Sequence, residues 1–182
     1  MSAPERIVTD RLVGRRIRSS DLSYVVETDS DAAMQATLSG NVQGFEESKA
    51  RLHRWLVVWE RHGFGFWVFN DGIRDVGHGG LFPSPRDPGS IEVGYALKPP
   101  YWNMGYATEM AAAVLRIAFE IVGLPNVVAI ALASNRASLR VMEKIGLRYE
   151  REFVYPDERI GVFYTIDRES WLKSAGPPTT PY

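Results

Sequence analysis

Cysteine is absent from this sequence of 182 residues. Its absence excludes disulfide bonds, zinc sites built on thiolates and a cysteine nucleophile together. The three histidines, His53, His62 and His78, do not have the spacing of a metal-ligand pair. We therefore expect no metal site, and we expect the histidines to be surface or structural residues.

A charge excess of one sign and long apolar runs are missing as well. The chain has 21 Lys and Arg against 22 Asp and Glu, so no bulk charge attracts nucleic acid or an anionic membrane. No apolar run approaches the roughly 20 residues of a membrane span. The first six residues lack the apolar core of a signal peptide. We expect a cytoplasmic monomer or homodimer that binds neither nucleic acid nor membrane.

The order of apolar patterns predicts the fold class. Periodic segments predict strands over 7–18, 64–70, 76–82, 90–97, 126–133, 147–154 and 160–166, and main helices over 45–62, 105–122 and about 136–145. Strands joined by hairpins and then by crossover helices indicate an α/β (mixed α+β) fold, with a mixed central sheet flanked by helices. We expect one domain over 7–172, flexible ends at 1–6 and 174–182, and an irregular connection over 29–44.

The most informative stretch begins with the strand at 90–97. Pro99 and Pro100 follow it and end it, because proline cannot donate to a ladder. The next helix starts with small residues, including Gly105 and Ala107. Free amides and the helix dipole make such a start positive, so the arrangement can hold a pyrophosphate. Close packing alone is the other explanation for the small residues.

A second motif opens the helix after the strand at 126–133. Asn135 is placed to cap that helix, and Gly146 is placed to end it.

These two stretches resemble the GNAT acetyltransferases. Tyr101-Trp-Asn-Met-Gly-Tyr-Ala-Thr-Glu109 is similar to the acetyl-CoA signature of the subgroup of ribosomal-protein N-terminal acetyltransferases, Trp-Gly-x-Gly-Tyr-Ala-Thr-Glu. It departs from that signature at Asn103, where glycine is usual, and at Met104. Asparagine is the best replacement for glycine if the loop needs a positive φ. The segment 135–147 resembles the second signature of the subgroup, and Thr9-Asp-Arg-Leu12 resembles its opening phrase.

The resemblance covers roughly 7–172 and implies both the GNAT fold and an activity. The implied reaction moves an acetyl group from acetyl-CoA, a cosubstrate, to a primary amine by direct attack, without a covalent enzyme intermediate. The amine acceptor is a small amine or a peptide N-terminus. The implied cofactor-binding residues are Ala96, Leu97, Asn103, Met104, Gly105, Tyr106, Ala107, Thr108, Asn135 and Ser138.

The amine must lose a proton, because an alkylammonium has a pKa near 10. Many family members carry a glutamate base on the strand before the pyrophosphate loop, and Glu92 fits that place. Strand alternation puts Glu92 on the same side as Gly94 and Ala96, which leaves room for a substrate. A solvated strand charge is the other interpretation. A backbone amide near Ala96 or Leu97 would stabilise the oxyanion.

The proton donor for the thiolate is less clear from the sequence. Many relatives have a tyrosine seven residues after the asparagine of the second signature, but this chain has Met142 there. Ser138 or water must replace it, or no acid is used. Glu109 lies within the cofactor helix, where a capping or ion-pair role is expected. Two alternatives stay open: a non-catalytic acyl-CoA-binding module, and a transferase that uses another acyl-CoA.

The acceptor side is expected in 29–47 and 152–160. These segments are rich in carboxylates, which predicts a cationic or amphipathic amine and argues against an acidic substrate. The carboxylates in question are Asp29, Asp31, Glu46, Glu47, Glu152, Asp157 and Glu158.

Overall fold

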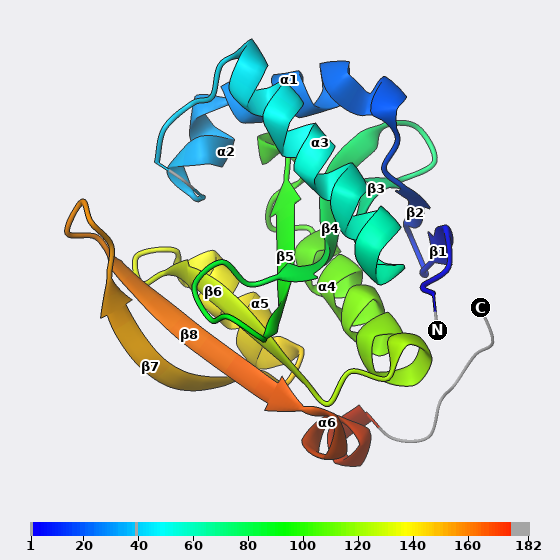
Figure 1. Cartoon of the computed structure of the whole chain (residues 1–182), viewed down its shortest axis with the longest axis vertical. Coiled ribbons are helices and arrows are strands. Elements are labelled where there is room, and N and C mark those ends of the chain that lie inside the picture. Colours follow the sequence, from blue (N-terminus) through cyan, green and yellow to red (C-terminus); the bar gives the residue numbers. More distant parts are fainter. Residues whose placement is uncertain (1, 39, 176–182) are drawn as a thin grey trace.

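The structure is a computed structural model that describes residues 2–38 and 40–175. Eight strands form one sheet in the order β1-β2-β3-β4-β5-β6-β8-β7, with helices on both faces (Figure 1). The predicted mixed α/β architecture is therefore confirmed. From residue 176 onward, the expected flexible C-terminal end lies outside the described residues. The strands are β1 (Arg6–Val8), β2 (Val13–Arg16), β3 (Phe66–Asn70), β4 (Asp75–Pro83), β5 (Ile91–Leu97), β6 (Asn126–Leu132), β7 (Arg148–Val154) and β8 (Ile160–Asp167).

The three main helices occupy the predicted places. α2 falls in the segment 29–44, for which the sequence predicts an irregular connection. No helix in the described ranges is both long and apolar enough to cross a membrane. The helices are α1 (Leu22–Ser30), α2 (Ala32–Ala36), α3 (Phe45–His62), α4 (Tyr106–Arg116), α5 (Arg136–Lys144) and α6 (Arg168–Ala175), with short turns η1 (Ser19–Asp21), η2 (Pro99–Tyr101) and the π-helical η3 (Ile117–Val122) that continues α4.

The first predicted strand, 7–18, is in fact a hairpin of β1 and β2. The two strands pair antiparallel, with Ile7 opposite Gly14. The chain reverses because Thr9 and Leu12 exchange backbone and side-chain bonds: the Thr9 amide donates to the Leu12 carbonyl at 2.9 Å, and the Leu12 amide donates to the Thr9 hydroxyl at 2.9 Å.

Residues 2–5, within the segment 1–6 that is expected to be flexible, lie against the sheet. The Ala3 amide donates to the Gly63 carbonyl at 2.7 Å, and the Trp67 indole donates to the Pro4 carbonyl at 3.0 Å. Ala3 itself is buried.

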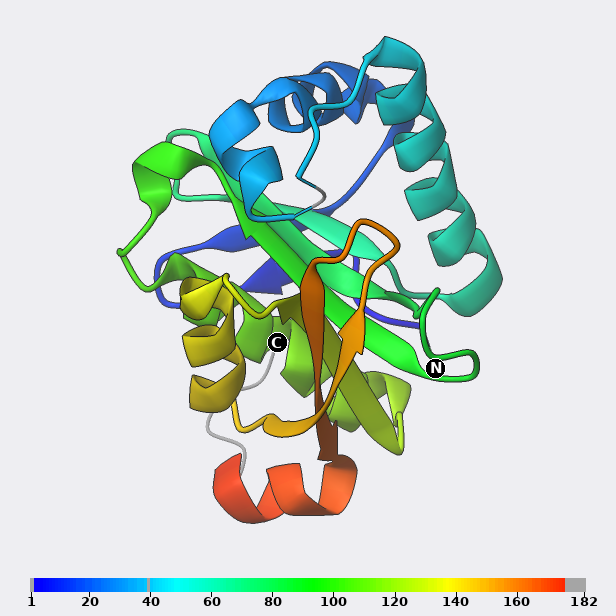
Figure 2. The ribbon, with the colours of Figure 1, turned by 90° about the vertical axis from the view of Figure 1, so that its left-hand side faces the viewer.

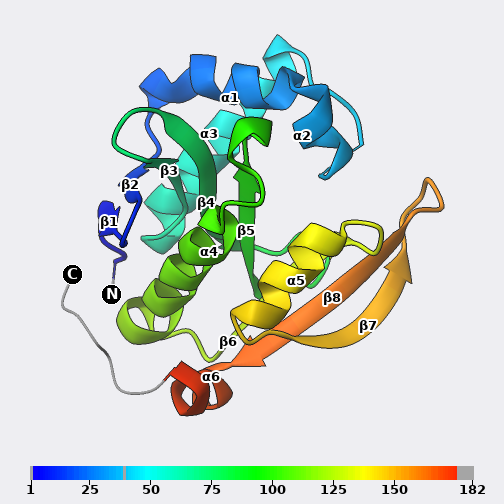
Figure 3. The same ribbon diagram turned by 180° about the vertical axis from the view of Figure 1, so that it is seen from behind.

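Alternate residues of β4 face two different layers of helices. His78 packs against Tyr24 of α1 and Trp55 of α3. On the other face, a Cβ added at Gly79 would lie 3.1 Å from Met110 of α4. Figure 3 shows α4 and α5 together on that second face. Trp55 is buried, as is Trp59 one turn later, so both tryptophans belong to the core.

The sheet is interrupted in its middle. β5 pairs with β4 along its whole length, but its parallel pairing with β6 is limited to Glu92 opposite Val128. β6 continues along β8 instead. Beyond Glu92 the edge of β5 therefore has no strand partner in the described chain, and the two strands diverge. This gap opens toward the C-terminal ends of both strands (Figure 3).

The β7–β8 hairpin closes one side of the molecule. In Figure 2 its tip approaches α2 and the segment that follows α2. A Cβ added at Gly40 would lie 2.7 Å from the Arg159 guanidinium, which places the two segments in contact.

Candidate active site

The loop between β5 and α4 is built on two left-handed residues. Asn103 has a φ of 62° and Gly105 a φ of 81°. The chain leaves β5 through η2, and the Trp102 indole donates to the Leu97 carbonyl at 2.8 Å. The expectation that Asn103 stands where a positive φ is required is confirmed, and the departure from glycine at this position keeps the loop geometry.

The start of α4 carries free backbone donors. Gly105 is its N-cap, and no side chain of the described residues caps it. The first bond of the helix runs from the Glu109 amide to the Gly105 carbonyl at 3.1 Å. The amides of Tyr106, Ala107 and Thr108 therefore have no partner within the helix, and the dipole adds positive charge there. These free donors fit a diphosphate, and a Cβ added at Gly105 beside them would lie 3.3 Å from Nη2 of Arg11.

Glu109 ties this helix to the first hairpin. Its Oε1 accepts the Thr9 hydroxyl at 2.6 Å and the Arg11 amide at 2.8 Å, and its Oε2 accepts the Arg11 Nε at 2.7 Å. Arg11 also donates to the Met104 carbonyl at 2.9 Å, which steadies the loop. Burial would raise the pKa of Glu109, but the bonds from Thr9 and Arg11 outweigh it and hold that pKa below its ordinary value. The expected ion-pair role of Glu109 is confirmed.

The unpaired edge of β5 presents particular amides to the gap. The Lys98 amide donates to the Val76 carbonyl on the β4 side at 2.9 Å. In an antiparallel pair, successive residues direct their amides to opposite sides. The register with β4 is continuous, so Tyr95 and Leu97 direct their amides toward the gap, whereas Ala96 faces β4. Of the two expected oxyanion donors, Leu97 is placed for that role and Ala96 is not.

On the far side of the gap stands the start of α5. Asn135 caps this helix by accepting the Ser138 amide at 3.1 Å, and its Nδ2 donates to the Thr37 carbonyl at 3.0 Å. Both ends of this side chain therefore have protein partners, and the predicted cap is confirmed. Met142, in the place of the usual tyrosine, is 1% exposed and packs in the core.

Tyr95 bridges the gap, a contact that the sequence analysis missed. Its hydroxyl lies 3.1 Å from both the carbonyl and the Oγ of Ser138. Burial raises the pKa of Tyr95 to about 12, although the bond to Ser138 opposes this shift. The sequence contained a signal, because Tyr95 alternates with Glu92 and so faces the opposite side of the sheet. Its contact with Ser138 of α5, 43 residues later in the sequence, could be found only from the tertiary structure.

Glu92 lies buried at the point where β5 and β6 separate. Its side chain is on the face of α3, and the residue is 9% exposed. The Ser84 hydroxyl donates to Glu92 Oε2 at 2.9 Å. Burial raises the pKa of Glu92 from 4.5 to about 7, opposed by the Ser84 bond and by the charge of Arg86. Glu92 is therefore not a solvated strand charge, and it can exchange a proton near neutral pH.

The surroundings of Glu92 differ from the expected carboxylate cleft. Asp29 is buried, with its Oδ1 2.9 Å from Arg51. Asp157 pairs with Arg159 at 2.7 Å. The charged group that acts on Glu92 is instead Arg86, on the turn between β4 and β5. Its guanidinium lies over the rings of Tyr155 and Phe153.

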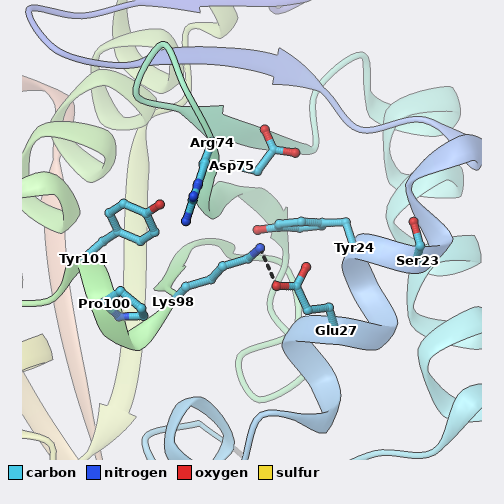
Figure 4. A pocket seen from close by; sticks show the side chains of 8 residues that line it. All are labelled: Ser23, Tyr24, Glu27, Arg74, Asp75, Lys98, Pro100 and Tyr101. Carbon is cyan, nitrogen blue, oxygen red and sulfur yellow. Dashed lines mark hydrogen bonds and ion pairs between the residues drawn. The ribbon is translucent and has the colours of Figure 1, made fainter.

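A cavity of about 500 Å³ lies at the other end of β5 (Figure 4). Lys98 and Glu27 face each other across it at 2.8 Å, and the Lys98 ammonium lies over the Tyr24 ring. Glu92 is roughly 20 Å away along the strand, at about 3.3 Å per residue. This cavity is therefore separate from the buried carboxylate. Its lining residues are Ser23, Tyr24, Glu27, Arg74, Asp75, Lys98, Pro100 and Tyr101.

Residues 11–148 match the family described as acetyltransferase (GNAT) domain. A protein of Aspergillus fumigatus named FsC-acetyl coenzyme A-N(2)-transacetylase is 32% identical over 174 residues, which cover 86% of this chain and 74% of the relative. A GNAT-family acetyltransferase structure from Bacillus anthracis superposes with a TM-score of 0.75 at 27% identity, over 90% of this chain and 99% of the other. A spermidine N-acetyltransferase from Vibrio cholerae, solved with CoA and spermine, shares the fold at a TM-score of 0.74 and 15% identity, over 89% and 98%.

The raised pKa of Glu92 predicts a stability penalty that appears at high pH. The folded state favours protonated Glu92, so the free energy of unfolding falls as pH rises from 4.5 to about 7. Glu92→Gln removes this penalty and should raise the free energy of unfolding at pH 8 by about 3 kcal/mol, with little effect at pH 4. Urea denaturation at the two pH values measures the difference.

Glu109→Gln is the matched control, because the pKa of Glu109 is shifted downward. The ionised Glu109 side chain contributes to the free energy of unfolding above the pKa that it has in the unfolded chain, and this contribution is lost as pH falls through its lower pKa in the folded state. Glu109→Gln should therefore be less stable than the wild type at pH 8. An equal effect of Glu92→Gln at pH 4 and pH 8 would contradict the buried carboxylate.

Proposed function

The chain belongs to the acetyltransferase (GNAT) family and is an acetyl-CoA-dependent acyltransferase, and we propose that it transfers the acetyl group directly to a primary amine. The acceptor is a small amine or a peptide N-terminus. The observation that carries this proposal is Glu92, a buried carboxylate with a pKa of about 7 at the point where β5 and β6 separate. The single eight-stranded sheet from β1 to β7 supports one catalytic domain over 7–172.

Backbone groups supply most of the site for acetyl-CoA, which brings an activated acetyl thioester. The free amides of α4, at Tyr106, Ala107 and Thr108, would hold its diphosphate, and the loop at Asn103, Met104 and Gly105 shapes that cradle. The unpaired edge of β5 at Tyr95 offers backbone partners to the amide groups of the pantetheine arm. Asn135 contributes by positioning α5 and Ser138, since both ends of its side chain have protein partners.

Glu92 accepts the proton of the amine. At pH 7 an alkylamine with a pKa near 10 is only about 0.1% neutral, so a base beside the bound amine increases the reactive fraction. The nitrogen becomes more acidic as it bonds to carbon, and a carboxylate with a pKa of about 7 then takes the proton readily. The Leu97 amide, directed into the gap, would stabilise the negative charge that develops on the carbonyl oxygen.

Tyr95 would assist departure of the thiolate. A thiol has an ordinary pKa of about 8.5, so complete proton transfer from a phenol with a pKa of about 12 is uphill by about 5 kcal/mol. Tyr95 is therefore a hydrogen-bond donor to the leaving sulfur, and solvent supplies the proton. Ser138, whose Oγ lies 3.1 Å from the Tyr95 hydroxyl, orients that donor.

The signature phrases give one refinement of the acceptor. The stretch from Trp102 to Glu109 resembles ribosomal-protein N-terminal acetyltransferases, which favours a protein N-terminus as one acceptor.

Binding of acetyl-CoA should depend on the open cradle at Gly105. Gly105→Asn adds a side chain there while tolerating the φ of 81°. At a hundred times its dissociation constant, acetyl-CoA should stabilise the wild type by about 2.7 kcal/mol, and this shift should vanish in the variant. Gly123→Asn is the matched control, because Gly123 has a φ of 78° and open space around its Cβ. An undiminished shift in Gly105→Asn would remove the cradle from the site.

Loss of the base should lower turnover. Glu92→Gln is expected to reduce kcat/KM at neutral pH by a factor on the order of a hundred, with acetyl-CoA affinity unchanged. In the wild type, kcat/KM should rise with pH through about 7. Ser84→Ala should shift this rise in kcat/KM to higher pH, because the hydrogen bond from Ser84 lowers the pKa of Glu92. The assignment fails if Glu92→Gln keeps the wild-type pH–rate profile.

Tyr95→Phe removes one hydroxyl and should lower kcat about tenfold, the equivalent of one neutral hydrogen bond. Acetyl-CoA affinity should change little. Tyr164→Phe is the control, since the Tyr164 hydroxyl also bonds α5, at Glu143 over 3.3 Å. If both variants turn over at the wild-type rate, Tyr95 only packs between β5 and α5.

A further inference from the structure

We propose that Arg86, held on Tyr155 and Phe153, forms a subsite for a carboxylate of the acceptor, so that the preferred acceptors are primary amines that also carry a carboxylate. Free amino acids are the simplest members of this class. The inference rests on the proposed role of Glu92 and adds the acceptor class to it.

The backbone of Arg86 is coupled to the proposed base through Ser84. The Ser84 hydroxyl donates to Glu92 Oε2 at 2.9 Å, and Ser84 Oγ in turn accepts the Arg86 amide at 3.4 Å. The charge of Arg86 lowers the pKa of Glu92. Arg86 is thus joined to the proposed base through Ser84, and its charge acts on the place where an acceptor amine would meet Glu92.

Two aromatic rings of the β7–β8 hairpin hold the guanidinium. Its central carbon is 4.1 Å from the centroid of the Tyr155 ring and 5.2 Å from that of Phe153. A guanidinium stacked on a ring keeps its N–H groups in the plane, where they match the two oxygens of a carboxylate. The subsite is therefore oriented before any acceptor arrives.

Arg86 differs from its neighbours in having no carboxylate partner. In the described ranges, no Asp or Glu oxygen lies within 4.0 Å of its guanidinium, whereas Arg151 on the same hairpin lies 3.4 Å from Asp87. Three of the carboxylates expected to receive a cationic acceptor serve other partners: Asp29 pairs with Arg51, Asp31 accepts the Met34 amide at 2.8 Å, and Asp157 pairs with Arg159. The charge near Glu92 that would meet the acceptor is thus positive. The proposed acceptor is therefore an amine that carries a carboxylate, in place of the cationic amine expected from the sequence.

The test compares paired acceptors that differ only in this charge. CoA release is measured with ω-amino acids, from glycine to 6-aminohexanoate, and with their uncharged amides; a second arm uses peptides with Glu or Gln at position two. The wild type should prefer the carboxylate member of the best pair by ten- to a hundredfold in kcat/KM, the scale of a charged hydrogen bond. Arg86→Gln should collapse this ratio, mainly through KM, and Arg86→Lys should retain part of it.

Arg16→Gln is the control, because the Arg16 guanidinium also stacks on a ring, at 4.8 Å from Trp59, but belongs to β2. This variant should keep the wild-type ratio. If Arg86→Gln does not fold, the wild-type ratio decides alone, and it must fall as NaCl rises. Equal rates for acids and amides, or a ratio that survives in Arg86→Gln, overturns the subsite and leaves the transferase intact. No CoA release with any amine would overturn the proposed function itself.

Discussion

β5 and β6 run parallel but are paired only at Glu92 and Val128, and the candidate site depends on this early separation. An unpaired strand edge inside a sheet leaves backbone donors and acceptors without partners, which is costly unless a ligand or water satisfies them. Here the vacant edge belongs to the strand that also carries the proposed base and leads into the uncapped helix. One discontinuity in the ladder thus leaves an unpaired polar strand edge on the strand that leads to the free amides at the start of α4.

Glu92 and Glu109 show how the surroundings of a carboxylate set its pKa. Glu92 is buried with one hydroxyl donor, and its pKa rises to about 7. Glu109 accepts bonds from Thr9 and from the amide and guanidinium of Arg11, and its pKa falls below the ordinary value. The same side chain is therefore a proton acceptor in one place and a permanent anchor in the other, because hydrogen bonds to Glu109 compensate for its desolvation.

The acceptor side illustrates why counting charges along the chain can mislead. Segments 29–47 and 152–160 contain many carboxylates, yet Asp29 is buried against Arg51 and Asp157 pairs with Arg159. A charge that already has a partner presents little field to a substrate. Arg86 lies in the turn between β4 and β5, has no carboxylate partner among the described residues, and lowers the pKa of Glu92 by its charge. The charge that acts on Glu92 therefore belongs to a residue outside both segments.

The sequence by itself determined the features that local stereochemistry controls. Asn103 and Gly105 have positive φ, α3 ends at the left-handed Gly63, and Asn135 caps α5, because each depends on a few neighbouring atoms. The alternation of strands and helices likewise sufficed for the fold class, since apolar periodicity is local. Only the tertiary structure decided how deeply Glu92 is buried, which β5 amides face the gap, and that Tyr95 meets Ser138. These properties join segments tens of residues apart, and no periodicity along the chain encodes the distance between them.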